Sequence, residues 1–139
     1  QLGNVYQAGK LSGNPIAMLA CFTMLSHLKN DTSIYNRLDQ KTQYLKKGLH
    51  DVLTEKSIHH RINQMGSMIS LHLCDHDIID FESSSKSNIQ MFNKLFHHML
   101  ESGIYLPPSA YESWFLSNAL TYEDIDKTCS ALSSFNFEM

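Results

Sequence analysis

Apolar residues recur at helical spacing in several parts of the chain. Between residues 32 and 56 they alternate with charged residues every three or four positions, which predicts an amphipathic helix that Thr32 caps. Residues 88–102 show the same pattern and stop before Gly103, the residue type that most often ends a helix. Residues 15–28 are apolar on more than one face, which predicts a helix that is well buried.

Alternating apolar and polar residues predict short strands between these helices. Residues 68–73 alternate strictly, so one face of this strand is expected to be buried. Three shorter strand candidates are residues 58–62, 104–106 and 114–117. Residues 74–87 are polar and rich in serine, which predicts an exposed loop. Thr121 and Asp124 have the spacing of a capping box for a final helix that ends near Phe135.

The order of these elements predicts the fold class. Because the strands are short and unevenly spaced, we expect an α+β (two-layer α/β) fold with a small, mainly antiparallel sheet and helices on one face. The 139 residues are one domain's worth of chain, enough for a hydrophobic core.

Composition excludes several classes of protein. Hydrophobic residues make up 42% and charged residues 18%, as in an ordinary globular protein, and the net charge of −3 provides no basic field for nucleic acid. The sequence contains no run of about 18 apolar residues, so no membrane-spanning helix is predicted. The start resembles a turn and not a signal peptide, and we interpret the chain, which begins at Gln1, as an excised domain.

The chemistry of the cysteines and histidines is less specific. Cys21, Cys74 and Cys129 are an odd number at wide spacing, which indicates a reducing compartment, and the first and last are expected to be buried in helices. His59–His60 and His97–His98 are neighbours whose rings point in different directions, so we expect no metal site.

The segment before the first helix has the features of an anion site. Asn14 can cap the helix and Pro15 fits its first position, while Gly9 and Gly13 permit tight turns. Free backbone N–H groups at such a junction, with the cation of Lys10 nearby, suit a phosphate.

Four stretches of the chain, in order and from end to end, resemble the glutamate-1-semialdehyde 2,1-aminomutases, pyridoxal-phosphate enzymes related to class III aminotransferases. The stretches are Tyr6-Gln7-Ala8-Gly9-Lys10-Leu11-Ser12-Gly13-Asn14-Pro15, residues 63–68, residues 103–117 and residues 121–128. The resemblance implies that residues 1–14 lead in from a large domain absent from this chain. It implies that residues 15–139 are the C-terminal small domain of a fold-type I transferase.

The resemblance also implies an activity. The whole enzyme would convert glutamate-1-semialdehyde to 5-aminolevulinate in tetrapyrrole (porphyrin) biosynthesis, as a cytoplasmic homodimer with pyridoxal 5'-phosphate. The Schiff-base lysine of this family lies upstream of the present chain. We therefore expect no catalytic residue within residues 1–139, and no activity from them alone.

The family's site residues can be carried over position by position. Gly9 and Lys10 would bind the cofactor phosphate, although the family has a threonine where Lys10 stands; a lysine would make a charge-assisted contact, or it is simply a solvated loop residue. Glu112 would line the substrate site, or it is a surface carboxylate. Trp114 and Leu120 stand where the family prefers glycine and histidine.

Two alternatives remain open. The chain could belong to another class III aminotransferase that acts on a different amine, or it could be a non-catalytic dimerisation domain with an aminotransferase-like fold. The Tyr111–Glu112 loop favours the aminomutase, because it follows that family beyond the general Ser-Gly-Asn-Pro motif. A hydrolase is not supported, since no Gly-x-Ser-x-Gly elbow occurs.

Overall fold

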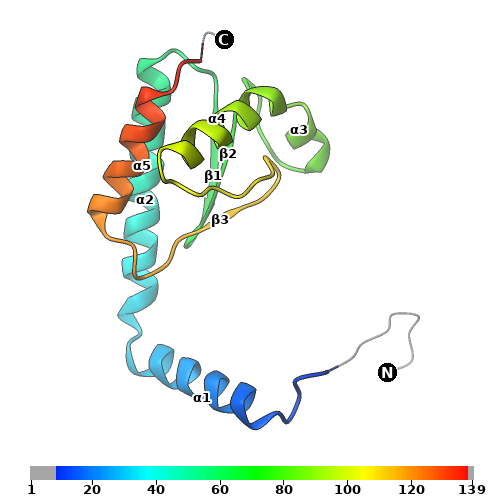
Figure 1. Ribbon diagram of the computed structural model, residues 1–139, viewed down its shortest axis with the longest axis vertical. Coiled ribbons are helices and arrows are strands. Elements are labelled where there is room, and N and C mark those ends of the chain that lie inside the picture. The colour runs from blue at the N-terminus through cyan, green and yellow to red at the C-terminus, as the bar shows by residue number, and fades with distance from the viewer. Residues whose placement is uncertain (1–8, 138–139) are drawn as a thin grey trace, which may run out of the picture. The chain divides into compact units, whose positions relative to one another are not determined.

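The chain divides into two units, residues 1–34 and 35–139, and a computed structural model describes residues 9–137 (Figure 1). Tyr6, Gln7 and Ala8 of the first family motif lie outside the described residues. Within the described range no helix is long and apolar enough to cross a membrane. The division into a lead-in at residues 1–14 and a small domain at residues 15–139 stays a prediction.

The first unit contains helix α1, Pro15–Asn30. Its start is as predicted: the Asn14 side chain accepts hydrogen bonds from the backbone N–H groups of Ile16 and Ala17, both at 3.1 Å, and Pro15 occupies the first position. The predicted burial is wrong, because no residue of α1 is buried and Cys21 is exposed. Large apolar side chains that stand in solvent are Ile16, Met18, Leu19, Phe22, Met24 and Leu25.

This exposure has a physical reason. A helix that is apolar on several faces needs partners on several sides, and the described residues of its own unit do not supply them. Exposed apolar surface of this kind is typical of a contact site for protein that lies outside the described residues.

The second unit alternates helices with a small sheet. Its elements are α2 (Ser33–Glu55, which begins just before the boundary), β1 (Arg61–Met65), β2 (Met68–His72), α3 (Phe81–Ser85), α4 (Ile89–Glu101), β3 (Trp114–Phe115) and α5 (Tyr122–Ser134). The strands pair in the order β1-β2-β3, both pairs antiparallel, which confirms the predicted sheet. Figure 1 shows α2 and α5 side by side.

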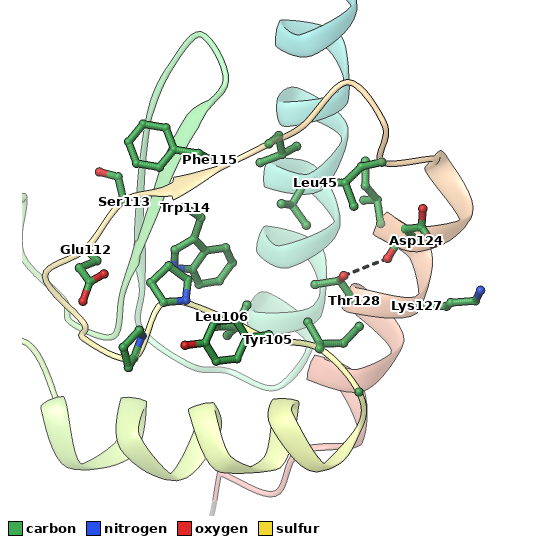
Figure 2. Close-up of a pocket in the computed structure, with 17 residues that line it drawn as sticks. Leu45, Tyr105, Leu106, Glu112, Ser113, Trp114, Phe115, Asp124, Lys127 and Thr128 are labelled. Atoms are coloured by element: carbon green, nitrogen blue, oxygen red, sulfur yellow. Dashed lines mark hydrogen bonds between the residues drawn. The ribbon is translucent and has the colours of Figure 1, made fainter. Parts of the chain in front are cut away.

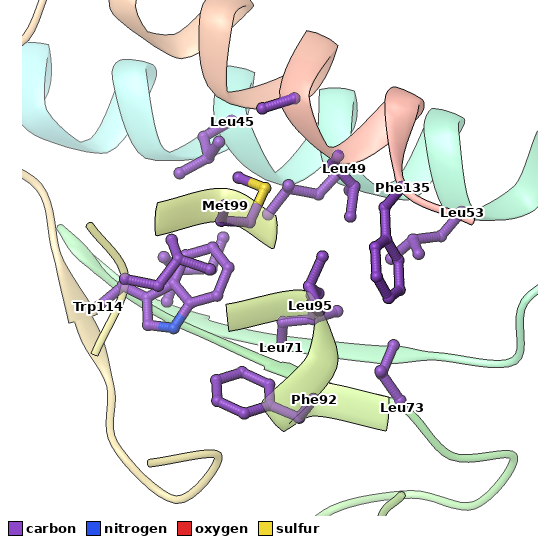
Figure 3. Close-up of a cluster of buried hydrophobic side chains, with 14 of the residues drawn as sticks. Leu45, Leu49, Leu53, Leu71, Leu73, Phe92, Leu95, Met99, Trp114 and Phe135 are labelled. Carbon is purple, nitrogen blue, oxygen red and sulfur yellow. The ribbon is translucent and has the colours of Figure 1, made fainter. Parts of the chain in front are cut away.

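The core lies between β2 and three helices. The predicted alternation of β2 is confirmed, since Ile69 and Leu71 are 1% and 2% exposed and Leu73 continues their face. They pack against side chains of α2, α4 and α5 (Figure 3), among them Leu45, Leu49, Leu53, Phe92, Leu95, Met99, Leu132 and Phe135. Helices α2, α4 and α5 therefore cover one face of the sheet.

Two strand predictions need correction. β1 starts at Arg61 and not at Ile58, because the N–H of Ile58 still donates to Leu53 O (2.8 Å) at the end of α2, with Ser57 in the left-handed region at φ 58°. Residues 104–106 form no strand, although Leu106 is buried. The prolines that follow have no N–H with which to extend a ladder.

The segment 74–87 is largely the exposed loop that was predicted, but it also contains a short helix and covers the polar face of the sheet. The Arg61 guanidinium donates to Asp77 Oδ1 (3.0 Å) and Asp75 O (3.2 Å), and the Asn63 amide donates to Ile78 O (3.0 Å). This segment contains α3, and Cys74, Ser84 and Ser87 are buried. Most of the segment is exposed, as predicted, and its polar composition therefore serves both the solvent and the polar face of the sheet.

Helices α2 and α5 approach closely at a glycine. A Cβ atom at Gly48 would collide with the Sγ of Cys129, so the absence of a side chain permits the contact. Burial raises the pKa of the Cys129 thiol to about 11, with smaller contributions from Asp126 and Asp51. Cys129 therefore stays protonated and packs as a small apolar side chain.

We expect Gly48→Ala to destabilise the protein. Crowding at a packed contact costs about 1–3 kcal/mol, which exceeds the gain of about 1 kcal/mol from the higher helix propensity of alanine. In a Cys129→Ala background the same change should stabilise instead, because the colliding sulfur is gone. Denaturant unfolding of the four proteins measures the coupling, and additive effects would contradict it.

A buried histidine lies on the other face of β2. His72 is 6% exposed, with its Nε2 atom 3.1 Å from Ser70 Oγ and its Nδ1 atom 3.4 Å from Ser84 Oγ. Burial lowers the pKa of His72 from its ordinary value of 6.5. The folded state therefore favours the neutral ring.

This burial predicts a loss of stability in acid. Because the unfolded chain binds the His72 proton below pH 6.5 and the folded chain resists it, the free energy of unfolding should fall as the pH drops below 6.5. His72→Gln should flatten this dependence, whereas the exposed His97→Gln should leave it unchanged. Unfolding midpoints at pH 7.5 and 5.5 provide the measurement; equal slopes in both variants would refute the assignment.

Candidate functional site

An open groove of about 780 Å³ lies between residues 103–116, Leu120 and the first half of α5 (Figure 2). Leu106, Trp114 and Leu116, all buried, form its apolar lining. Glu112 and Ser113 stand at one end of the groove, and polar residues of α5 stand at the other.

The Glu112 loop is held by its own backbone. The N–H of Glu112 donates to Ser109 O (3.1 Å), and the N–H of Tyr111 donates to Ser109 Oγ (3.2 Å). Ala110 is buried in the core and anchors the turn. The Glu112 side chain is exposed, and no residue in the described part of the chain hydrogen-bonds its carboxylate. The carboxylate is therefore available to a ligand.

An aromatic contact that the sequence did not predict supports this loop. The ring of Tyr111 lies 5.3 Å from the ring of Phe81, centroid to centroid. Phe81 is the first residue of α3, and Asp80 and Ser83 form a capping box at the N-terminus of this helix. The spacing of Asp80 and Ser83 is the sequence signal for this helix, which is short and lies in a polar segment. Through Phe81, α3 thus contacts the turn that carries Glu112.

The polar groups at the other end are already engaged. The carboxylate of Asp124 accepts from the Thr121 N–H (2.8 Å) and the Thr121 hydroxyl (2.7 Å), and these hydrogen bonds lower the pKa of Asp124. Lys127 pairs with Glu123 at 3.2 Å. The hydrogen bonds between Thr121 and Asp124 confirm the predicted capping box of α5. Of the charged side chains that line the groove, Glu112 therefore remains without a described partner.

The two departures from the family pattern belong to the core. Trp114 is 7% exposed and Leu120 is half-buried against the same cluster. Both side chains also line the groove. They therefore make the groove more apolar than glycine and histidine would.

Lys10 lies on a tight turn in the first unit. The Ser12 N–H donates to Gly9 O (2.9 Å), the Asn14 N–H donates to Leu11 O (3.1 Å), and Gly13 has φ 78°. A Cβ atom at Gly9 would meet Ser12 Oγ, so another residue there would require the Ser12 side chain to move. The Lys10 side chain is exposed, and no described residue pairs with its ammonium group.

The expectation of free N–H groups at the helix start is wrong. The Asn14 side chain takes those of Ile16 and Ala17, and Asn14 O takes that of Met18 (2.9 Å). An anion at this turn would therefore contact the Lys10 ammonium and the turn around Gly9, which fit a phosphate by charge. Lys10 and Glu112 belong to different units, and each is described within its own.

Across residues 9–137, no three histidine, cysteine, aspartate or glutamate side chains gather to hold a metal ion. His59–His60 and His97–His98 form no such group, and neither do His72, Cys74 and His76.

Comparison with known proteins identifies the family. Residues 1–135 match the family described as aminotransferase class-III, and the chain belongs to this family. It is 50% identical over 131 residues to the glutamate-1-semialdehyde 2,1-aminomutase of Flavobacterium psychrophilum, covering 94% of this chain and 31% of that protein. It is 41% identical, with the same coverage, to the protein of that name from Thermus thermophilus.

Solved structures agree on the fold. An omega-transaminase from Sphaerobacter thermophilus superposes with a TM-score of 0.80 at 22% identity, over 94% of this chain and 29% of that one. A structure titled "Transaminase with PLP bound" gives a TM-score of 0.73 at 19% identity, over 93% of this chain and 28% of that one. The chain thus spans about a third of the length of the curated relatives it matches.

Proposed function

We propose that this chain is the C-terminal part of a glutamate-1-semialdehyde 2,1-aminomutase. The observation that carries the proposal is the 50% identity to a protein of that name over 94% of the chain. The whole enzyme moves an amino group within glutamate-1-semialdehyde to give 5-aminolevulinate for tetrapyrrole synthesis. It acts in the cytoplasm on a small amino-acid substrate.

Pyridoxal 5'-phosphate supplies the electron sink for this chemistry when bound, and the chain contributes orientation and charge. The Lys10 ammonium, on the turn that Gly9 permits, donates a charge-assisted hydrogen bond to the cofactor phosphate. Support for this role comes from the exposure of Lys10 and its lack of a described partner.

Glu112 acts on the substrate side. Its carboxylate accepts a hydrogen bond from the substrate amine and orients it, because the loop leaves this group uncommitted at the rim of an apolar groove.

The intact enzyme is a homodimer in this proposal. The exposed apolar side chains of α1 support it, since such surface is normally covered by protein. Lys10 lies four residues before Asn14, the cap of α1, so the turn around Lys10 would lie close to a dimer contact made through α1.

Lys10→Ala in the intact protein should weaken cofactor binding more than it slows turnover. A charge-assisted hydrogen bond contributes roughly 1.5–3 kcal/mol, and at about 1.4 kcal/mol per decade this is a tenfold to hundredfold loss of affinity. Lys10→Thr should recover much of it. Cofactor titration decides: unchanged affinity in Lys10→Ala would make Lys10 a solvated loop residue.

Glu112→Gln should lower turnover and leave cofactor affinity nearly unchanged, because its carboxylate faces the substrate and not the phosphate. The assay follows conversion of glutamate-1-semialdehyde to 5-aminolevulinate by the intact wild type, the Glu112→Gln variant and a Ser113→Ala control. Full turnover in Glu112→Gln would remove its substrate role. A wild type that transaminates another amine and makes no 5-aminolevulinate would favour the alternative class III activity.

A further inference from the structure

Two histidines far from the Glu112 loop bring their ring nitrogens together. His50, on the exposed side of α2, and His60, just before β1, place Nδ1 and Nε2 2.9 Å apart, with ring centroids 5.0 Å apart. His50 is open to solvent and His60 is half-buried. The sequence does not predict this pair, because the two histidines are ten residues apart and belong to different elements.

A backbone carbonyl fixes the tautomer of His60. Its Nδ1 atom lies 2.8 Å from Ile58 O, and a carbonyl oxygen can only accept, so Nδ1 carries the hydrogen. A neutral His60 therefore presents the lone pair of Nε2 towards His50. Metal-binding histidines typically have their second ring nitrogen hydrogen-bonded in this way, which orients the ring and raises its basicity.

The spacing of the two nitrogens suits a shared metal ion. Two nitrogen ligands about 2.0–2.1 Å from a metal lie about 2.9 Å apart when they meet it at a right angle, and about 3.4 Å apart at a tetrahedral angle. The observed 2.9 Å is the length of a hydrogen bond from His50 Nδ1–H to His60 Nε2, and a metal ion at the right-angle distance would replace that proton between the two nitrogens. The rings would have to turn towards a common point, but the backbone of α2 and of the segment before β1 would not have to move apart.

We propose that His50 Nδ1 and His60 Nε2 form a two-ligand site for a divalent transition-metal ion, with water completing the coordination. The right-angle geometry and the imidazole ligands favour Cu²⁺ and Ni²⁺ over Zn²⁺. No third metal-binding side chain joins the pair within residues 9–137, so the ion stays exchangeable. Lys46 and Lys47, one turn earlier on α2 and beside His50, carry positive charge that limits the affinity.

A bound ion would connect the last third of α2 to the entry of β1. These elements are otherwise joined by the short segment 56–60, in which Ser57 has φ 58°.

The test is a titration of the intact protein with Cu²⁺, Ni²⁺ and Zn²⁺ separately, for wild type, His50→Ala, His60→Ala and a His97→Ala control. His97 is an exposed histidine on α4 and has no part in the pair. We expect wild type and His97→Ala to bind one ion alike, Cu²⁺ most tightly. Replacing either ligand should lower the metal affinity by more than the roughly tenfold to hundredfold that follows loss of an outer-shell partner.

A second measurement on unmodified protein avoids any effect of the substitutions on folding. Paramagnetic Ni²⁺ at substoichiometric amounts should broaden the ring resonances of His50 and His60 before those of the other histidines. Equal metal affinity in wild type, His50→Ala and His60→Ala, or broadening that begins at other histidines, would overturn the proposal. Neither readout depends on catalytic activity.

Discussion

The structure depends on the burial of one face of β2 beneath α2, α4 and α5. Ile69 and Leu71 are almost fully enclosed there, and because side chains alternate along a strand, Ser70 and His72 must point the other way. A polar second face then requires polar cover, which the segment 74–87 provides through Arg61 and Asn63. The register of β2 thus determines the chemistry on both sides of the sheet.

The same strand positions the candidate substrate loop. Ile69 pairs with Trp114, so β3 is fixed at the edge of the sheet and Trp114 enters the core. Glu112 precedes Trp114 by two positions and is left at the rim of the groove, while the contact between Tyr111 and Phe81 holds the preceding turn against α3. These contacts hold the backbone of the turn that carries Glu112.

Local signals in the sequence predicted local structure well. The caps at Asn14 and Thr121 and the glycine at position 103, with φ 80°, all act as expected, because each depends on a few neighbouring residues. The predicted burial of α1 was wrong because an apolar pattern shows that a partner is needed but not where it lies. Segment 74–87 was correctly predicted to be mostly loop, but its contacts with the sheet were not, because its partners lie on another strand.

The candidate site also combines features that the sequence predicts with features that only the structure shows. The motifs around Lys10 and Glu112 were recognisable because they are continuous in sequence, and both side chains are exposed. The occupied N–H groups at the start of α1 were not predictable, since Asn14 could have bonded one donor or two. The pairs Phe81–Tyr111 and His50–His60 bring together residues from different elements. Only a folded chain reveals them.

The Cys129 thiol against Gly48 has a consequence for the redox chemistry of the protein. With a pKa of about 11, about one thiol in ten thousand is ionised at pH 7, and the thiolate is the form that reacts with oxidants and alkylating agents. Cys74 is buried and Cys129 is half-buried, whereas Cys21 is exposed on α1. A thiol reagent applied to the folded chain would therefore report on the accessibility of α1, and the labelling of Cys21 would measure how far that helix is covered by other protein.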